Sequence, residues 1–176
     1  MSYSRVRKRP GSQDGVTILE TLIAVSILLI VSVGILAMGM VAMTTTENQG
    51  HRAARTAEYA QDKTEQLMSL AYTDSTSDTT VFPTANGGGS GLSVGGSADP
   101  NAPVAQYVDY LDADGNLQPS GGGAPAGWFY KRVWQISTPA GTTNLKQITV
   151  TTTAASGVGN GTAPQSSVSA LKTSPF

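Results

Sequence analysis

The sequence predicts an α+β fold, in which one long N-terminal helix packs on a small antiparallel sheet with long Gly/Ser/Thr-rich loops. Two observations lead to this prediction. A helical pattern runs over residues 16–72 without a proline. The rest of the chain, residues 73–176, holds short alternating strand patterns separated by stretches rich in Gly, Ser and Thr.

The composition excludes several classes of protein. The 176 residues include no Cys and a single His, so the sequence contains neither a disulfide framework nor a multi-histidine metal site. Eleven basic and twelve acidic side chains give a net charge of −1, which provides no overall positive field for nucleic acid. Nucleophile-elbow, phosphate-loop and paired-carboxylate motifs are also missing from the sequence. We therefore expect no enzymatic activity, no cofactor and no nucleic-acid partner.

The first part of the predicted helix, residues 16–43, is apolar enough to cross a membrane. It is interrupted only by Thr17, Glu20, Thr21, Ser26, Ser32 and two glycines. About 20 apolar residues span a bilayer as a helix, and Ser and Thr hydroxyls can bond to the helix's own carbonyls. The preceding residues carry a basic cluster: Arg5, Arg7, Lys8 and Arg9. By the positive-inside rule, residues 1–15 stay cytoplasmic and the chain beyond about residue 44 is exported.

The second part of the predicted helix, residues 44–72, is amphipathic. Small and apolar side chains recur at spacings of four and three, as Ala53, Ala57, Ala60, Thr64, Leu67 and Ala71. Charged side chains cover much of the remaining helix surface: Arg55, Glu58, Asp62, Lys63 and Glu65. The pattern predicts that the first set faces the sheet and that the second set is solvated.

The head, residues 73–176, contains four strand candidates. They cover residues 106–111, 128–137, 145–153 and 167–171, and one more short strand is allowed within 73–103. The second candidate alternates, with Trp128, Tyr130, Arg132, Trp134 and Ile136 on one face. The first candidate ends in a turn-forming segment, residues 112–116. An antiparallel sheet with one face on the helix and one face in water follows from this alternation.

The junction between the basic leader and the apolar run is the most specific motif in the chain. A basic leader ends at Gly15, and Glu20 follows five residues later at the head of the apolar run. This arrangement resembles the class III signal sequence of type IV pilins and pseudopilins. The resemblance implies that a membrane-bound prepilin peptidase cuts between Gly15 and Val16 and methylates the new amine of Val16. Phe is the family's usual residue after the cut, and this chain has Val there.

A physical argument supports a special role for Glu20. A carboxylate within a membrane helix is costly, so it is retained where something requires it. The new amine at Val16 of a neighbouring subunit would neutralise this carboxylate when helices bundle, because opposite charges attract strongly at low dielectric. Such a contact would set the stagger between subunits in a filament core.

The C-terminal segments narrow the resemblance to a subfamily. Residues 129–137, 145–153 and 167–176 are similar to PilV-like minor pilins, which are type IV pilus modification proteins. The resemblance implies a structural protein of the bacterial inner membrane, assembled with other major and minor pilins into a pilus or held in the periplasm. A minor pseudopilin of a type II secretion system fits the same pattern. A membrane-anchored exported binding domain and a cleaved secretory signal peptide are the alternatives outside the family.

Three weaker sites complete the candidates. Asp112, Asp114 and Asn116 offer three oxygen ligands for calcium, but the closing Glu of a calcium loop is missing, which favours a plain turn. Lys131 and Arg132 among aromatic side chains resemble a single-strand nucleic-acid platform, yet two cations are too few for a phosphate track. His51 has no chemical partner nearby in the sequence and is expected to be solvated.

Overall fold

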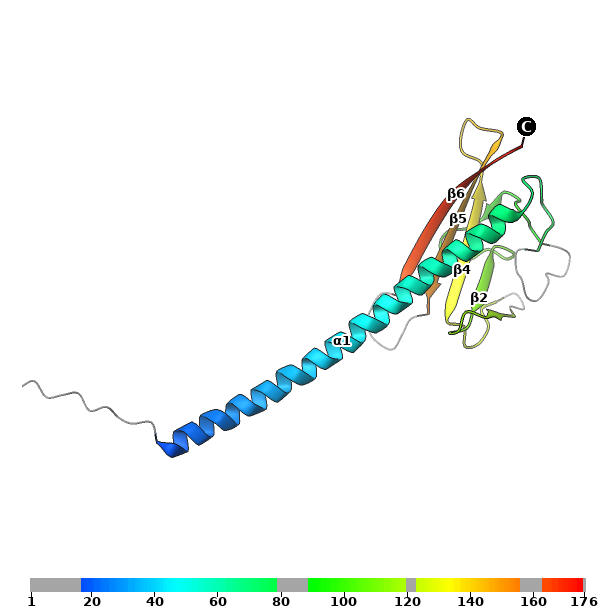
Figure 1. Ribbon diagram of the computed structural model, residues 1–176. Helices are drawn as coiled ribbons and strands as arrows, with labels where there is room; N and C mark the ends of the chain where they lie inside the picture. The colour runs from blue at the N-terminus through cyan, green and yellow to red at the C-terminus, as the bar shows by residue number, and fades with distance from the viewer. Residues whose placement is uncertain (1–16, 79–88, 120–122, 156–162, 176) are drawn as a thin grey trace, which may run out of the picture. The chain divides into compact units, whose positions relative to one another are not determined.

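The computed structural model describes residues 17–78, 89–119, 123–155 and 163–175 (Figure 1). They form one α-helix and a six-stranded antiparallel sheet, which confirms the predicted α+β class. The chain divides into two compact units, Met1–Thr46 and Glu47–Phe176, called here the N-terminal unit and the head unit. Helix α1 (Ile18–Ser69) has 52 residues and contributes to both units. The basic cluster Arg5, Arg7, Lys8 and Arg9 and the junction residues Gly15 and Val16 lie outside the described residues.

The ends of α1 are defined by specific hydrogen bonds. Thr17 precedes the first turn, and its carbonyl and hydroxyl oxygens accept from the backbone N–H of Glu20 at 3.0 and 3.3 Å. This is the arrangement of an N-cap, which satisfies a donor that the helix itself cannot. At the other end, the ammonium of Lys172 donates to the carbonyl oxygen of Met68. The last turn of α1 contains no basic residue, so a lysine distant in sequence caps its C-terminus.

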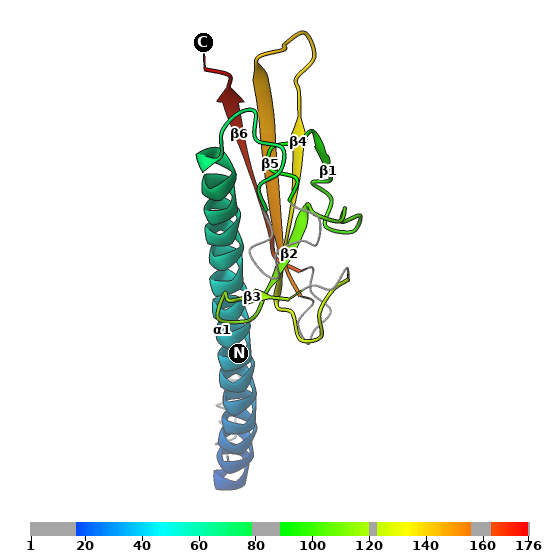
Figure 2. The same cartoon turned by 90° about the vertical axis from the view of Figure 1, so that its right-hand side faces the viewer.

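The sheet is antiparallel throughout, and its strands follow the order β3-β2-β4-β5-β6, with β1 also paired to β4 (Figure 2). The strands are β1 (Gly95–Gly96), β2 (Val108–Leu111), β3 (Leu117–Gln118), β4 (Tyr130–Ser137), β5 (Leu145–Ala154) and β6 (Gln165–Thr173). Strands β4, β5 and β6 form the extended part of the sheet, with Trp134 opposite Val150 and Val150 opposite Val168.

The four predicted strands are present with shifted ends. The first begins only at Val108, because Gln106 has a φ of 68° and Tyr107 N–H bonds back to the Val104 carbonyl. The last is longer than predicted and covers Gln165–Thr173. β3 was not predicted, because two residues after a turn are too few to show an alternating pattern.

The core of the head unit lies between α1 and the sheet. It contains Ala60, Leu67, Leu92, Tyr107, Trp134, Ile136, Ile148 and Val150. The predicted helix stripe is correct at Ala60, Thr64 and Leu67. It is wrong at Ala53, Ala57 and Ala71, which are exposed. The buried face is instead formed by Thr56, Tyr59, Ala60, Lys63, Thr64 and Leu67. This face carries larger side chains, which fill the space over the sheet better than a row of alanines does.

Candidate functional site

The apolar first half of α1 is the most unusual surface of the N-terminal unit. Every large hydrophobic side chain from Ile18 to Met43 is between 51% and 83% exposed. A helical window apolar enough to cross a membrane lies here, and none of it is buried. The core helix of a soluble protein would be buried, so a membrane anchor or a signal sequence accounts for this surface better. Residues 18–43 extend for about 39 Å at 1.5 Å per residue, enough to cross the bilayer core of about 30 Å.

The polar side chains within this apolar half are satisfied inside the helix. Ser26 and Ser32 donate their hydroxyls to the carbonyls of Leu22 and Leu28, each at 2.7 Å. Thr21 donates to the carbonyl of Ile18 at 2.8 Å. The expectation that these hydroxyls bond within the helix is therefore confirmed. They add no unpaired donor to a lipid-facing surface.

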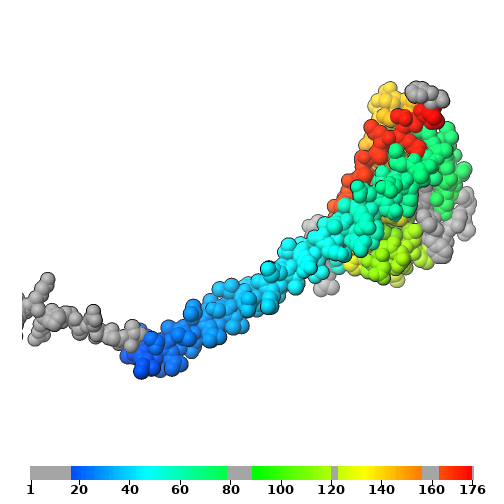
Figure 3. Space-filling model, viewed as in Figure 1, coloured from blue at the N-terminus to red at the C-terminus, as the bar shows by residue number. Residues whose placement is uncertain are grey.

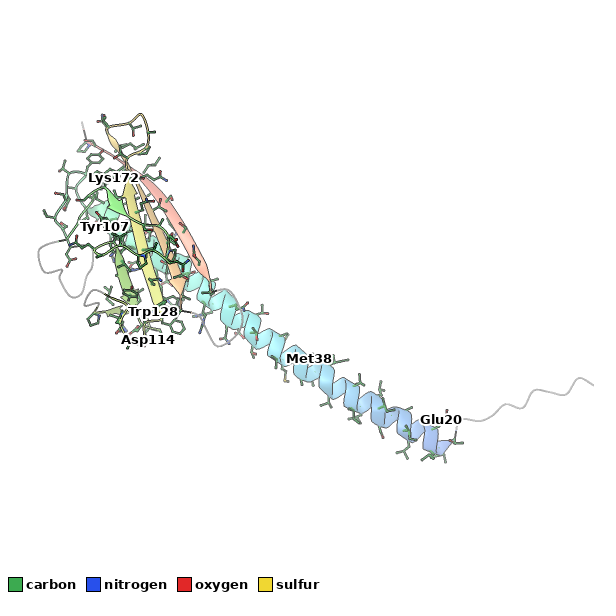
Figure 4. All side chains as sticks on the ribbon, turned by 180° about the vertical axis from the view of Figure 1, so that it is seen from behind. Glu20, Met38, Tyr107, Asp114, Trp128 and Lys172 are labelled. Carbon is green, nitrogen blue, oxygen red and sulfur yellow. The ribbon has the colours of Figure 1, made fainter. Side chains whose placement is uncertain are left out.

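Glu20 differs from these residues because its carboxylate has no partner among the described residues. It lies in the first turn of α1, and it is exposed (Figure 4). The positive end of the helix dipole favours a carboxylate at this position, but only by about 0.3–1 kcal/mol at an exposed site. Its own helix thus leaves this charge mostly uncompensated, surrounded by apolar side chains such as Leu19 and Ile23.

A second group of charges, absent from the sequence-based candidates, lies inside the head unit. The carboxylate of Asp109 on β2 accepts from Lys63 Nζ at 2.9 Å and from Arg132 Nε and Nη2 at 2.7 and 2.8 Å. Arg132 Nη1 reaches Asp62 on α1 at 2.8 Å. Two positive and two negative side chains thus form a neutral cluster that joins α1, β2 and β4. We call Asp62, Lys63, Asp109 and Arg132 the charge cluster.

The charge cluster is buried except at Asp62, whose side chain is 55% exposed. Burial lowers the pKa of Lys63, and the attraction of Asp109 offsets this only in part. Burial alone would raise the pKa of Asp109, but Lys63 and Arg132 outweigh it and bring that pKa below its usual value. Lys63 Nζ also lies 4.2 Å from the centre of the Trp134 ring, a cation–π contact. The cluster is therefore a structural connection between helix and sheet.

The prediction that Lys63 is solvated is wrong, and the physical reason is pairing. A lysine is buried when a carboxylate and a ring face meet its ammonium, and here Asp109 and Trp134 do so. One signal in the sequence indicated Arg132, which alternates with Tyr130 and Trp134 on the inward face of its strand. No local pattern identifies Asp109, because its partners Arg132 and Lys63 lie at least 23 positions away in the sequence.

Of the two cations in the possible nucleic-acid platform, Lys131 and Arg132, only Lys131 is accessible to a ligand among the described residues. Arg132 is committed to Asp109 and Asp62 inside the head unit. Lys131 lies 5.4 Å from the centre of the Trp128 ring and is partly exposed. One accessible lysine beside an aromatic ring does not make a track for phosphates.

His51, which was expected to be solvated, is exposed on α1.

The turn at residues 112–116 uses its first carboxylate to hold its own backbone. Asp112 Oδ1 accepts from the N–H groups of Asp114 and Asn116, both at 2.9 Å, and Oδ2 accepts from Asn116 Nδ2 at 3.1 Å. Hydrogen bonds from Asn116 are the main reason that the pKa of Asp112 lies below its usual value. The described residues contain no group of three His, Cys, Asp or Glu side chains able to hold a metal ion. The arrangement is that of an Asx turn.

This turn meets the helix at Gly115, which we expect to tolerate no side chain. Its φ is 89°, and a Cβ atom there would lie 2.4 Å from the Tyr59 hydroxyl oxygen. Gly115→Ala should therefore lower the free energy of unfolding by about 1–3 kcal/mol. Gly127→Ala is the matched control, because its φ of 79° is similar and nothing lies within 4 Å of a Cβ at that exposed site. Urea unfolding of the two variants measures the difference, and equal midpoints would contradict the close packing of this turn on Tyr59.

No family model, no curated protein and no solved structure matches this chain. The exposed apolar half of α1, the uncompensated Glu20 and the compact head unit are therefore the features from which a function is argued.

Proposed function

We propose that this chain is the precursor of a type IV minor pilin, most similar to the PilV-like class, with a structural role in pilus assembly. The observation that carries the proposal is the apolar half of α1, which is exposed on all sides and has one carboxylate in its first turn. In a membrane this surface anchors the precursor, and in a filament it packs against the same surface of other pilins.

The proposed mechanism begins with processing. Prepilin peptidase cuts between Gly15 and Val16, removes the basic leader and methylates the amine of Val16. The amine then carries a positive charge at the start of an apolar helix. Glu20 of the adjacent subunit compensates that charge, which sets the axial stagger of the two helices. Gly34 and Gly39 support close packing, because they lack a side chain, and beyond the helix's own neighbouring backbone no described atom lies within 4 Å of a Cβ at either position.

The head unit would supply the surface that faces away from the filament core. The charge cluster holds the second half of α1 against the sheet within residues 47–176. A minor pseudopilin of a type II secretion system would use the same mechanism in another filament.

Mass spectrometry of the mature N-terminus tests the proposal. In cells with active prepilin peptidase, the chain should begin at a methylated Val16, and it should retain residues 1–15 when the peptidase is absent. A chain that keeps its leader in both cells would be a signal-anchored protein with no filament role. A chain cut beyond the apolar segment would be a secreted protein with a cleaved signal peptide. Mass spectrometry of purified pili and of secretion pseudopili separates the pilin from the pseudopilin.

A further inference from the structure

Strand β6 forms a free edge of the sheet in the head unit. Among the residues that the structure describes, it pairs with β5 alone, over nine residues and without a bulge. Figure 1 shows β6 as the outermost strand, and in the space-filling view it forms the margin of the head unit (Figure 3). An edge of this length presents unpaired main-chain groups to any extended chain that approaches it.

The hydrogen-bond pattern shows which groups are free. Ser174 N–H donates to Asn144 and Ala154 N–H donates to Pro164, so the bonded pairs fall on the even-numbered residues of β6. The odd-numbered residues therefore direct their N–H and C=O groups to the open edge: Gln165, Ser167, Ser169, Leu171 and Thr173. All five are exposed, and none of the described residues bonds to their main chain.

This edge lacks the features that usually protect an edge strand. Natural edges carry a proline, a bulge or an outward charge that prevents pairing. β6 contains no proline, and Lys172, its one charged residue, donates to Met68 on α1. The edge is therefore competent to accept another strand.

The side chains beside the edge indicate what kind of strand fits. Thr149 and Thr151 of β5 bond to Ser169 and Ser167 at 3.0 and 3.2 Å, which makes an uncharged hydroxyl ladder on the outer face. Near the end of β6 lies a hollow of about 440 Å³, lined by Pro139, Leu145, Gln147, Ser169, Ala170 and Leu171. Leu171 is 58% exposed there. An uncharged strand with one apolar side chain over this hollow complements the surface.

We propose that the β6 edge binds an extended, uncharged segment of a different protein by strand addition, antiparallel to β6 as in every other strand pair of this sheet, and with an apolar side chain in the hollow. A second copy of this chain is a poorer occupant. Thr56 contacts Ser166 and Met68 contacts Lys172, so α1 and β6 run in the same direction. Two antiparallel β6 strands would therefore place two α1 helices in opposite directions. Copies anchored in one membrane do not adopt that arrangement, a step that rests on the proposed function.

Site-specific photo-crosslinking in the full chain tests this proposal. A benzophenone side chain is introduced at Ser167 or at Leu171, in cells that make the protein, with exposed Glu65 on α1 as the control position. We expect adducts from both edge positions, with the crosslinked peptide mapping to an uncharged, strand-forming segment of another protein. Adducts with a second copy of this chain, with a helical or charged segment, or with nothing at either edge position would overturn the proposal.

A proline substitution separates strand addition from ordinary contact. Ser169→Pro removes an N–H that faces the open edge, and it leaves the main-chain bonds between β5 and β6 intact, although it also removes the hydroxyl that bonds to Thr149. The adduct at Ser167 should fall at least tenfold in Ser169→Pro and stay unchanged in Ser169→Ala, which loses the same hydroxyl but keeps the N–H. A second variant, Ser167→Pro, removes another N–H that faces the open edge. Its effect is measured on the adduct formed by the benzophenone side chain at Leu171. An adduct that persists in both proline variants would refute pairing through the main chain.

Processing at Val16 is measured on the same samples. A normal mature N-terminus without an adduct at either edge position would refute strand addition and leave the proposed pilin function unaffected. A retained leader would reject the proposed pilin function instead, whatever the edge binds.

Discussion

Glu20→Ala and Glu20→Gln should both reduce incorporation into filaments at least tenfold, while membrane insertion and processing continue. The carboxylate has no partner among the described residues of its own chain, so the substitution costs the isolated subunit little. In the filament, it would leave the amine of a neighbouring Val16 uncompensated in an apolar environment, which is costly. Quantification of the chain in sheared filaments against the membrane fraction measures this effect.

Two comparisons make this prediction specific. Glu20→Gln keeps the size of the side chain and removes only its charge, so it separates electrostatics from packing. Glu47→Ala removes an exposed carboxylate on the same helix beyond the apolar segment, and it should be incorporated normally. If the Glu20 variants were incorporated as well as Glu47→Ala, the role of Glu20 in subunit register would be refuted.

Asp109→Asn should destabilise the head unit by about 3–5 kcal/mol, because it leaves the ammonium of Lys63 and the guanidinium of Arg132 buried without their shared carboxylate. Lys63 is fully buried and lies over the Trp134 ring, so its charge cannot reach water without opening the core. Urea unfolding of the full chain in detergent, followed by tryptophan fluorescence, measures the loss.

Asp62→Asn is the matched control for this effect. It removes a carboxylate from the same cluster, but the side chain of Asp62 is 55% exposed, and such pairs contribute about 1 kcal/mol or less. The two variants should therefore differ several-fold in their loss of stability. Equal losses would mean that burial of Asp109 is not what makes the cluster important.

Much of the architecture was predictable because it depends on patterns close in sequence. The apolar residues 16–43 and the absence of proline up to residue 72 predict the helix, and its observed bounds are Ile18–Ser69. Alternation over residues 128–137 and 145–153 predicts the two central strands, which pair over eight residues from Tyr130 to Ser137. Periodicity reports secondary structure well when each element is long enough to repeat its pattern.

The candidate sites divide in a similar way. Glu20 stands out in the sequence because a single carboxylate interrupts an apolar run, and in the structure it lies exposed in the first turn of α1. The predicted helix face is wrong at Ala53, Ala57 and Ala71, since the sheet selects the face that best fills its own surface. The free edge at β6 could not be predicted from the sequence. It depends on the order of the strands and on their hydrogen-bond register, and neither can be derived from the sequence of one strand.

The sequence by itself determined the single long helix, the apolar surface with Glu20 at its head and the α+β class, because each follows from local composition and spacing. Only the tertiary structure decided that Lys63, Asp109 and Arg132 meet in the core of the head unit. The physical reason is that a buried charge is tolerated only beside its partner. Lys63 and Asp109 lie on different elements, α1 and β2, and folding alone brings them within 2.9 Å.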